Sequence, residues 1–417
     1  MKGIFIILDG VADLPCKELG QKTPLEVAKT PNLDLIASKS KIDYCYSVKE
    51  NVAPQSSNAM ISLLGYDPLY VPRGPLEALG ANIQLTKGDL ALRVNFATID
   101  NLKNCTILDR RAGRSLTTKE AKILTKAINK NVKLNYPFKL YNTIQHRGVL
   151  VFRGGFSDNI TNADPGYGKG IALPTPEKGH KLNFSHSEDD ENDSQLSAEL
   201  INSFVRQSFN ILDKHHINIK RSQKGLPKAN IILARDAGNF PIKLKKLSGK
   251  WIGLAYMPLE TGIAKATGMK TYTFSYPRLK SKDVYETLHQ GLKKAIKNAK
   301  KMVKRNKKKY DYFYVHIKET DIPGHDGKPE EKVKMIETID HYLISALKKY
   351  LPTTQIIITA DHTTACPVKA HTADPVPVLY YNPQSLKNHN ERFTENQSLK
   401  GKKIMGRDLL KSTFFKT

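Results

Sequence analysis

Six residues of this 417-residue chain have the side-chain types and the spacing expected of a metal centre. They are three carboxylates and three histidines that lie at or shortly after the ends of strand-like runs: Asp9, Asp321, His325, Asp361, His362 and His371. Asp321 and His325 are about one helical turn apart, so both side chains can contact one ion. Mixed carboxylate and imidazole ligands favour Mn²⁺, Zn²⁺ or Fe²⁺ over Ca²⁺, which prefers oxygen ligands. Each residue alone could cap a helix or fill the core, but the six together predict a metal site.

Two adjacent serines are candidate nucleophiles for chemistry at such a site. Ser56 and Ser57 precede an apolar, helix-like run, and the backbone N–H groups at a helix N-terminus can hold a phosphate. Two metal ions in one site can activate a hydroxyl and stabilise the oxygens of a phosphoryl group during transfer. The local sequence by itself favours the plainer interpretation, in which a serine is only the N-cap of a helix.

A basic cluster supplies candidate groups for binding an anion. Arg110, Arg111 and Arg114 fall within five residues, and guanidinium groups bind carboxylate or phosphate through paired hydrogen bonds. Arg235, at the end of a strand-like run, and Lys318, close to the predicted metal site, are further candidates. The alternative interpretations are an exposed basic turn for the arginine cluster and a solvated side chain for Lys318.

Four continuous apolar runs predict the strands that position these residues. The runs cover residues 4–8, 229–234, 312–317 and 355–359 and are rich in β-branched side chains. Strands of this kind form parallel sheets that are buried on both faces. Open α/β sheets bind ligands beyond the carboxyl ends of their strands, which is where the polar residues of this chain recur. We therefore predict an α/β fold with a largely parallel sheet flanked by helices.

The middle of the chain has a different pattern. Short strands between residues 88 and 155 surround one helix from Thr118 to about Asn129, with Thr117 or Thr118 as its cap and Glu120 in its first turn. This pattern predicts a smaller α/β (α+β) domain inserted into a loop of the core, an arrangement that exposed loops tolerate.

These patterns assign residues 1–80 and 226–417 to the core and residues 81–225 to the inserted domain. Within the insert, we expect the acidic stretch 185–194 to be an exposed loop, followed by a helix over residues 195–212.

The net charge of the chain raises the question of nucleic-acid binding. Its 66 Lys and Arg residues exceed its 40 Asp and Glu residues, which gives a formal charge of +26. The densest basic stretch, residues 293–309, has the pattern of an amphipathic helix with apolar residues on one side: Ala295, Ile296, Ala299, Met302 and Val303. The sequence has neither zinc-finger spacing nor an aromatic-basic RNA motif, so we expect a small anionic substrate rather than nucleic acid.

The sequence also bears on the cellular compartment. No apolar run reaches the roughly 18 residues of a membrane-spanning helix, so we expect no membrane association. The first apolar run ends in Asp9 after five residues and is interpreted as a buried strand, not a signal peptide. Four widely separated cysteines indicate reduced thiols and a cytoplasmic location: Cys16, Cys45, Cys105 and Cys366. The oligomeric state is left open, with a homo-oligomer as one option.

Nine motifs make the chain similar to the archaeal-type, cofactor-independent phosphoglycerate mutases of the alkaline phosphatase superfamily. They occur in the family's order at residues 7–10, 23–34, 63–68, 73–80, 95–98, 107–114, 146–154, 316–327 and 359–379. The resemblance implies an alkaline-phosphatase-like core with an inserted domain, two divalent metal ions and a serine that becomes phosphorylated. The implied reaction interconverts 2-phosphoglycerate and 3-phosphoglycerate in glycolysis and gluconeogenesis, without 2,3-bisphosphoglycerate.

The resemblance also implies roles for the candidate residues. The members of one metal site are Asp9, Ser56, Asp361 and His362, and those of the other are Asp321, His325 and His371. Ser56 matches the nucleophile, and Lys318 matches a lysine just before a metal-binding aspartate. The residues expected to bind substrate are Arg110, Arg111 and Arg114, together with the anion-binding candidate Arg235. Mn²⁺ is the expected metal, with Zn²⁺, Co²⁺ and Mg²⁺ as alternatives.

Departures from the family pattern leave alternatives open. They are Gln55, Ser57, Asn58 and Met60 around the nucleophile, Thr261 where a lysine is usual, and Asp236 where a glycine is usual. One alternative is a diverged metal-dependent phosphotransferase, such as a homoserine kinase, or a phosphatase of the same superfamily. Another is a weakened scaffold or nucleic-acid binder that uses the +26 charge. Ungapped spacing to residues 63–68 selects Ser56 rather than Ser57 as the nucleophile.

Overall fold

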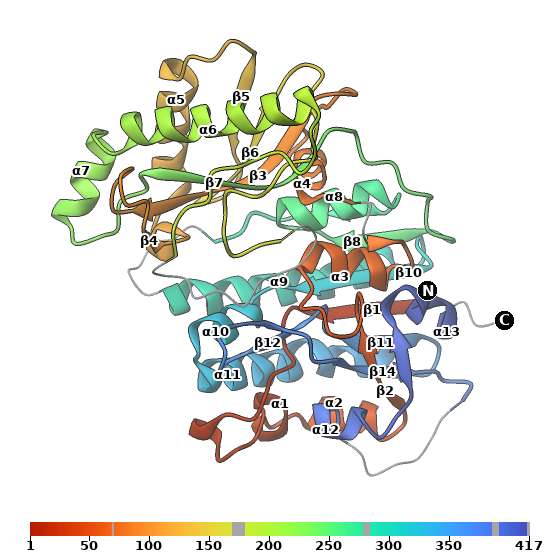
Figure 1. Cartoon of the computed structure of the whole chain (residues 1–417). Helices are drawn as coiled ribbons and strands as arrows, with labels where there is room; N and C mark the ends of the chain where they lie inside the picture. Colours follow the sequence, from red (N-terminus) through yellow and green to blue (C-terminus); the bar gives the residue numbers. More distant parts are fainter. Residues whose placement is uncertain (69–70, 169–179, 278–283, 386–391, 415–417) are drawn as a thin grey trace.

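A large sheet in the computed structural model holds three of the four predicted core strands (Figure 1). The structure describes residues 1–68, 71–168, 180–277, 284–385 and 392–414. From one edge to the other, the eight strands of this sheet are β15 (Lys403–Met405), β2 (Lys41–Tyr46), β14 (Val376–Tyr381), β11 (Gln355–Thr359), β1 (Gly3–Leu8), β10 (Tyr312–Ile317), β8 (Trp251–Leu254) and β9 (Lys270–Tyr272).

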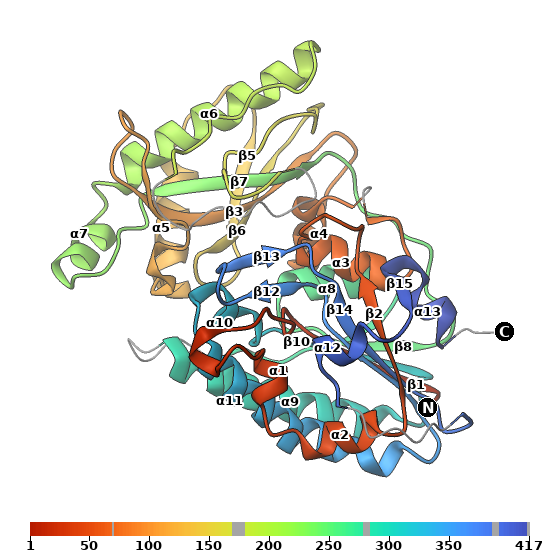
Figure 2. The same cartoon turned by 60° about the horizontal axis from the view of Figure 1, so that its bottom comes forward.

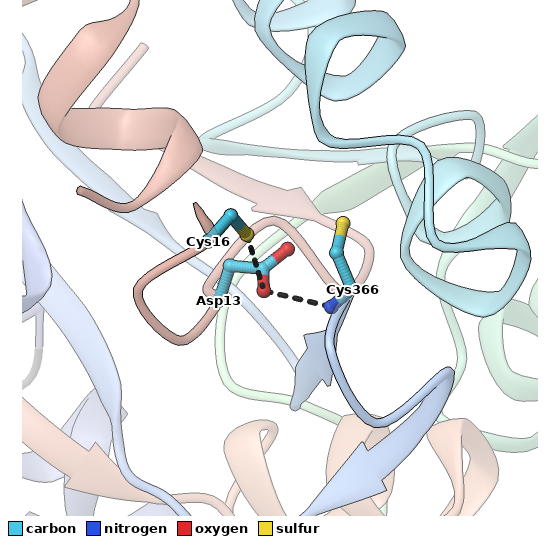
Figure 3. Close-up of side chains that lie close together, drawn as sticks. All are labelled: Asp13, Cys16 and Cys366. Carbon is cyan, nitrogen blue, oxygen red and sulfur yellow. Dashed lines mark hydrogen bonds between the residues drawn. The ribbon is translucent and has the colours of Figure 1, made fainter. Parts of the chain in front are cut away.

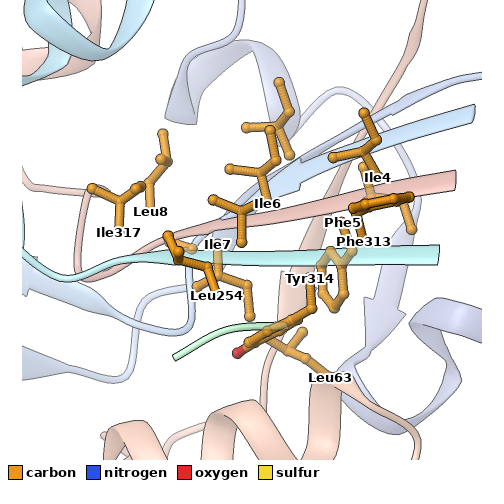
Figure 4. Packing of buried hydrophobic residues seen from close by; sticks show 14 of the residues in the cluster. Ile4, Phe5, Ile6, Ile7, Leu8, Leu63, Leu254, Phe313, Tyr314 and Ile317 are labelled. Carbon is orange, nitrogen blue, oxygen red and sulfur yellow. The ribbon is translucent and has the colours of Figure 1, made fainter. Parts of the chain in front are cut away.

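The centre of this sheet is parallel. β1 pairs in parallel with both β10 and β11, and β8 and β9 extend the parallel part beyond β10. β14 is antiparallel to its neighbours β11 and β2. Every residue of β1 is buried, and Figure 4 shows its side chains on both faces of the sheet. The predicted α/β fold with a largely parallel sheet is therefore confirmed.

Helices cover both faces of the large sheet (Figures 1 and 2). One face carries α3 (Ser56–Leu63) and α8 (Pro258–Ala266), and the other carries α2 (Pro31–Ala37), α9 (Val284–Asn306) and α11 (Pro329–Ile339). The five apolar residues predicted to form one side of a basic helix are all buried in α9. Their burial confirms that the dense lysine stretch is largely the solvent-facing side of an amphipathic helix.

A second, five-stranded sheet contains the middle of the chain. Its strands are β3 (Leu90–Ile99), β4 (Ile107–Asp109), β5 (Phe138–Asn142), β6 (Arg147–Phe152) and β7 (Ile231–Gly238), and α5 (Thr118–Asn131) and α6 (Asn192–Leu212) pack against it. Thr117 caps α5 through a capping box with Glu120. α6 begins at Asn192, inside the stretch predicted as an exposed loop, so the loop is shorter than expected.

β7 corrects one element of the sequence prediction. We expected the run of residues 229–234 to join the parallel sheet, but β7 pairs antiparallel with β3 in the second sheet. Strands buried on both faces have the same composition in either sheet, so the run alone could not separate the two. β7 lies on the core side of the boundary predicted at residue 226, and the division of the chain into domains stays a prediction.

Two glycines allow helices of the two sheets to touch. α4 (Arg73–Gly80) packs on the second sheet and against α8 of the large sheet. A β-carbon on Gly80 would overlap the carbonyl oxygen of Pro258, and one on Gly262 would overlap that of Leu76. The helices approach this closely only because neither position has a side chain.

The remaining strands and α-helices of the described residues are short. They are β12 (Thr363–Ala365), β13 (Ala370–Thr372), α1 (Pro24–Val27), α7 (His216–Gln223), α10 (Asp321–Asp326), α12 (Glu395–Ser398) and α13 (Leu409–Ser412). β12 and β13 form an antiparallel pair that follows β11 in the chain. None of the helices in the described ranges has a stretch long and apolar enough to cross a bilayer.

Candidate active site

The predicted metal ligands gather at the carboxyl edge of the large sheet. Asp9 follows β1, while Asp361 and His362 follow β11, its neighbour in the sheet. Gly10 has a φ of +56°, and its N–H donates to Asp361 Oδ1 at 3.1 Å. A β-carbon at this position would collide with Thr364, so the turn that joins the two strand ends requires a glycine.

One group of polar atoms surrounds His362. Its Nε2 atom lies 3.4 Å from Asp9 Oδ1 and 3.3 Å from Asp361 Oδ2. The hydroxyl of Ser56, the first residue of α3, lies 3.1 Å from the same nitrogen. The structure thus brings together the four residues that the resemblance assigns to one metal site.

A second group is centred on Asp321. His325, one turn later on α10, places Nε2 3.5 Å from Asp321 Oδ1. His371, on β13, places Nε2 3.7 Å from the same oxygen. The two groups adjoin, because the His371 and His362 rings stack with 3.6 Å between their centroids. These three residues are the ones that the resemblance assigns to the other metal site.

Hydrogen bonds on the far side of each imidazole leave Nε2 available to a metal ion. His371 Nδ1 lies 2.8 Å from the carbonyl oxygen of Pro54, and His325 Nδ1 lies 3.3 Å from that of Lys369. Since a carbonyl only accepts, both Nδ1 atoms carry the proton. His362 Nδ1 contacts a threonine hydroxyl at 3.0 Å. Outer hydrogen bonds of this kind orient histidine ligands in metal sites.

The carboxylates of the first group carry negative charge that neighbouring protein groups do not fully offset. Burial and the adjacent Asp9 carboxylate raise the pKa of Asp361 to about 7. Burial also opposes ionisation of Asp9, but the Lys318 ammonium and His316 hold its pKa well below the ordinary value. Among the described residues, Asp9 Oδ1 and Asp361 Oδ2 are buried without a hydrogen bond, while Asp9 Oδ2 faces the Lys318 ammonium. Buried carboxylates of this kind need a compensating cation, so these residues fit a divalent ion.

The histidines differ in how readily they bind a proton. Burial lowers the pKa of His362 well below its ordinary value and lowers that of His325 to about 3, so both imidazoles are neutral at pH 7. Burial also lowers the pKa of His371, but its hydrogen bond with Asp321 and the charge of that group raise it overall. Metal ligands must be neutral imidazoles, so a metal ion competes with a proton at His371.

The two candidate serines point in different directions. Ser56 lies on the wall of the cavity described below, with its hydroxyl against His362. Ser57 is 1% exposed and donates to Asn58 Oδ1 at 3.2 Å, and Asn58 in turn donates to the carbonyl oxygen of Pro68. The geometry therefore places Ser56, and not Ser57, among the predicted metal-site residues.

Lys318 lies between two buried carboxylates. Its ammonium forms an ion pair with Asp9 and lies 3.3 Å from Glu260 Oε1. The His316 ring lies between the same two acids, with Nε2 3.1 Å from Asp9 Oδ2 and Nδ1 3.8 Å from Glu260 Oε1. Lys318 also lines the cavity.

A cavity of about 150 Å³ adjoins the metal-site residues and has many basic side chains on its wall. The predicted residues that line it are Ser56, Arg111, Arg114, Arg235, Lys318, Asp321, His325 and His371. The wall does not include Arg110, whose guanidinium group pairs with Asp164 at 2.7 Å. Arg114 pairs with Asp326 at 2.8 Å, which links the segment after β4 to α10, the helix of Asp321 and His325. Substrate binding by these arginines stays a prediction.

Several polar residues on the wall were not identified from the sequence. They include Arg73, Arg93, Arg147, Glu77 and Glu260. Arg93 lies within the buried strand β3 and forms an ion pair with Glu77, which also accepts from Arg73 at 2.7 Å. The position of Arg93 inside an apolar run was a signal that the sequence offered. A buried arginine is almost always paired with an acid, so such a position indicates a buried ion pair. Nothing in the local sequence of Glu260 distinguishes it from an ordinary residue in the first turn of a helix.

Sequence comparisons agree with this geometry. A sequence model of the 2,3-bisphosphoglycerate-independent phosphoglycerate mutases matches residues 37–218. The chain is 39% identical to a protein of that name from Thermococcus gammatolerans over 420 residues, which cover 98% of this chain and 95% of the relative. A relative of the same name from Pyrococcus abyssi is also 39% identical, with coverage of 98% and 96%.

Two solved structures resemble the whole chain. The PH0037 protein from Pyrococcus horikoshii has a TM-score of 0.72 and 31% identity, covering 99% of this chain and 96% of its own. The cofactor-independent phosphoglycerate mutase from Thermoplasma acidophilum has a TM-score of 0.54 and 26% identity, with coverage of 100% and 99%. With the relatives matched over nearly their full length and the predicted metal-site residues assembled at one sheet edge, this chain belongs to the family of 2,3-bisphosphoglycerate-independent phosphoglycerate mutases.

Proposed function

We propose that this chain interconverts 2-phosphoglycerate and 3-phosphoglycerate through a phosphoserine at Ser56, without free 2,3-bisphosphoglycerate. The observation that carries the proposal is the position of the Ser56 hydroxyl, 3.1 Å from His362 Nε2 and on the wall of a cavity with several arginines. The names of the relatives support the same reaction. The enzyme would act on small-molecule phosphoglycerates in glycolysis and gluconeogenesis, in the cytoplasm.

The metal-site residues would hold two divalent ions. One ion would be held by Asp9, Ser56, Asp361 and His362, and the other by Asp321, His325 and His371. When bound, such ions lower the pKa of a serine hydroxyl and neutralise charge on phosphoryl oxygens. The three imidazoles favour a transition metal, and Mn²⁺ is the one we propose.

The residues of the chain would carry out two linked transfers. Ser56 Oγ loses its proton and bonds to phosphorus while the bond from phosphorus to the glycerate oxygen breaks, and that oxygen takes up a proton. Glycerate stays bound and reorients. Its other hydroxyl then loses a proton and bonds to the same phosphorus as the bond to Ser56 Oγ breaks, and Ser56 Oγ takes up a proton. The serine is regenerated, so phosphate is conserved within one substrate molecule.

Cationic side chains on the cavity wall would keep glycerate in place between the two transfers. Arg111, Arg114 and Arg235 can each bind a carboxylate or phosphate through paired N–H groups, and Lys318 offers a compact positive charge. Ser56 is only 8% exposed, which limits the access of water to the phosphoserine. Exclusion of water matters because hydrolysis would turn the mutase into a phosphatase.

A coupled assay tests the proposal directly. The purified protein, loaded with Mn²⁺ and free of 2,3-bisphosphoglycerate, is given 3-phosphoglycerate in the presence of enolase, and phosphoenolpyruvate is measured. The proposal predicts steady phosphoenolpyruvate formation that Ser56→Ala abolishes. Release of inorganic phosphate without phosphoenolpyruvate would instead indicate a phosphatase, and phosphorylation of added homoserine with a nucleotide would indicate a kinase.

A further inference from the structure

A second cluster of potential metal ligands lies outside the catalytic group. Asp13, Cys16 and Cys366 are buried, with exposed fractions of 2%, 0% and 3%. Each offers one ligand atom, and these atoms all lie within 4.8 Å of one another. Figure 3 shows the carboxylate and the two thiols close together, in loops that come from opposite ends of the chain. The proposed phosphoryl transfer uses none of the three.

The spacing of this cluster suits a tetrahedral ion. Cys16 Sγ lies 4.0 Å from Asp13 Oδ1, and it lies 3.3 Å from the carbonyl oxygen of Leu14. Cys366 Sγ lies 3.8 Å from the carbonyl oxygen of Pro323. With metal–sulfur bonds of about 2.3 Å and metal–oxygen bonds of about 2.0–2.2 Å, ligand atoms around a tetrahedral zinc lie about 3.5–3.8 Å apart. Small side-chain rotations bring the three atoms to these separations, and a nearby carbonyl oxygen can be the fourth ligand.

The carboxylate of the cluster is already oriented by neighbouring groups. Asp13 Oδ1 accepts from the backbone N–H groups of Leu14 and Cys366, both at 2.8 Å. Asp13 Oδ2 accepts from Lys332 Nζ at 2.7 Å. Bonds of this kind hold a carboxylate in position when it also binds a metal.

Lys332 supplies the charge that such a site needs. Its side chain is 0% exposed, and its ammonium also donates to the carbonyl oxygens of Ala12 and Thr364. A divalent ion bound by two thiolates and one carboxylate has one net negative charge, which the Lys332 ammonium offsets. Burial raises the pKa of both thiols, that of Cys16 to about 12, so both are protonated when no metal is bound. Each thiol therefore releases its proton to solvent as its bond to the metal forms.

We propose that Asp13, Cys16 and Cys366 form a third metal site, which takes a thiophilic divalent ion such as Zn²⁺ and is separate from the catalytic pair. Cys16 follows Asp9 by seven residues and Cys366 follows His362 by four. An ion bound here fastens together the two chain segments that present residues of one catalytic metal group. The site is structural: it holds those segments in place and touches no substrate.

Cadmium titration of the Mn²⁺-loaded full chain tests the site, because thiolate–cadmium bonds absorb in the ultraviolet. No cysteine belongs to the seven catalytic metal-site residues, so cadmium that displaces Mn²⁺ there produces no thiolate absorption. We expect absorption that saturates at one equivalent per chain and is lost in Cys16→Ser and in Cys366→Ser. Cys45→Ser and Cys105→Ser are matched controls that also remove a buried thiol, and both should retain the signal.

Several outcomes would overturn the third site. One is the absence of thiolate–cadmium absorption in folded wild type, and another is absorption that persists in Cys16→Ser and Cys366→Ser. A protein mass lower by two hydrogens, with Cys16 and Cys366 both unreactive towards a thiol reagent, would show a Cys16–Cys366 disulfide instead. Circular dichroism checks that each variant is folded, and Cys16→Ala and Cys366→Ala replace a serine variant that fails this check.

Discussion

Gln55 and Asp236 are joined by a hydrogen bond, with Gln55 Nε2 3.2 Å from Asp236 Oδ1. Both also hold the guanidinium group of Arg235: Gln55 Oε1 accepts from Nη1 at 2.9 Å, and Asp236 forms an ion pair with the same nitrogen. Both residues are among the departures from the family pattern, and a glycine is usual at the position of Asp236. The two departures are therefore one arrangement, which fixes a cationic side chain on the cavity wall.

The backbone explains why a glycine suits the second of these positions. Asp236 has a φ of +54°, in the left-handed region that most side chains avoid and that aspartate tolerates better than most. The pairing of β7 with β3 also shifts register near this point. The aspartate thus accepts an unfavourable conformation and gains two polar contacts that a glycine cannot make.

A double-mutant cycle tests whether this pair acts as a unit. We expect Gln55→Ala and Asp236→Gly each to lower kcat/KM for 3-phosphoglycerate, mainly through a higher KM, because Arg235 loses a partner. Since both residues hold the same group, the effects should be coupled by about 0.5–3 kcal/mol. Steady-state kinetics of the wild type, both single variants and the double variant give this number. Strictly additive effects would show that the two residues act independently.

Removal of the metal should disable catalysis. We expect excess EDTA to abolish activity and Mn²⁺ to restore it in the wild type.

Removal of one metal-site imidazole should also disable catalysis. His371→Ala should lose bound metal and several orders of magnitude in kcat, since Asp321 and His325 alone hold an ion weakly. Elemental analysis and the coupled assay give both quantities. His289→Ala is the control, because His289 pairs with Glu331 and is not one of the predicted metal ligands. This variant should retain full metal content. Normal turnover of His371→Ala, or of wild type in EDTA, would contradict the metal assignment.

The buried pair of Glu77 and Arg93 should make stability depend on pH. Burial opposes ionisation of Glu77, but the charges of Arg93 and Arg73 lower its pKa to about 2. The unfolded state therefore binds a proton at a higher pH than the folded state does. The stability that this group supplies is complete above the unfolded pKa of about 4.5 and is lost as the pH falls towards 2.

Glu77→Gln should reveal this contribution. We expect the variant to be destabilised by about 3 kcal/mol at pH 7, because Arg93 is left buried without its charged partner. The difference from wild type should shrink steadily below pH about 4.5, which follows from the linkage of proton binding to folding. Urea unfolding at a series of pH values measures it. A difference that stays constant down to pH about 3 would show that the Glu77 charge is not involved.

Ser57→Ala should affect stability more than catalysis. The variant loses the hydrogen bond to Asn58 inside the core, which should cost about 1 kcal/mol of unfolding free energy. Its kcat should stay within about tenfold of wild type, a change of 1.4 kcal/mol in the barrier. Urea unfolding and the coupled assay measure the two effects separately. An inactive but fully folded Ser57→Ala variant would mean that the serines exchange roles.

The strand ends were predictable from the sequence because three apolar, β-branched runs end at polar residues. Asp9, Asp321 and Asp361 follow β1, β10 and β11, which are adjacent in the sheet. The same reasoning was wrong for β7, since a buried antiparallel strand looks like a buried parallel one. Periodicity reports burial, and it does not report which sheet provides the neighbours.

Contacts between distant segments could not be predicted from the sequence. The pairing of Gln55 with Asp236 joins the N-cap of α3 to β7, and the pairing of Glu77 with Arg93 joins α4 to β3. Local sequence patterns identify which residues are buried or cap a helix, but a long-range pair depends on how the helices and strands pack in three dimensions. The helix contact at Gly80 and Gly262, which ties these sheets together, is likewise visible only in three dimensions.

We propose that Ser56 carries the phosphoryl group between the two hydroxyls of glycerate, and trapping the phosphorylated enzyme tests this role. Mn²⁺-loaded enzyme is mixed with 3-phosphoglycerate, quenched in acid within the first turnovers, digested and analysed by tandem mass spectrometry. We expect phosphate on Ser56, at a level that falls to zero in Ser56→Ala while that variant keeps its fold and metal content. Phosphate on Ser57 or on any other residue, or turnover without phosphoserine in the wild type, would contradict it.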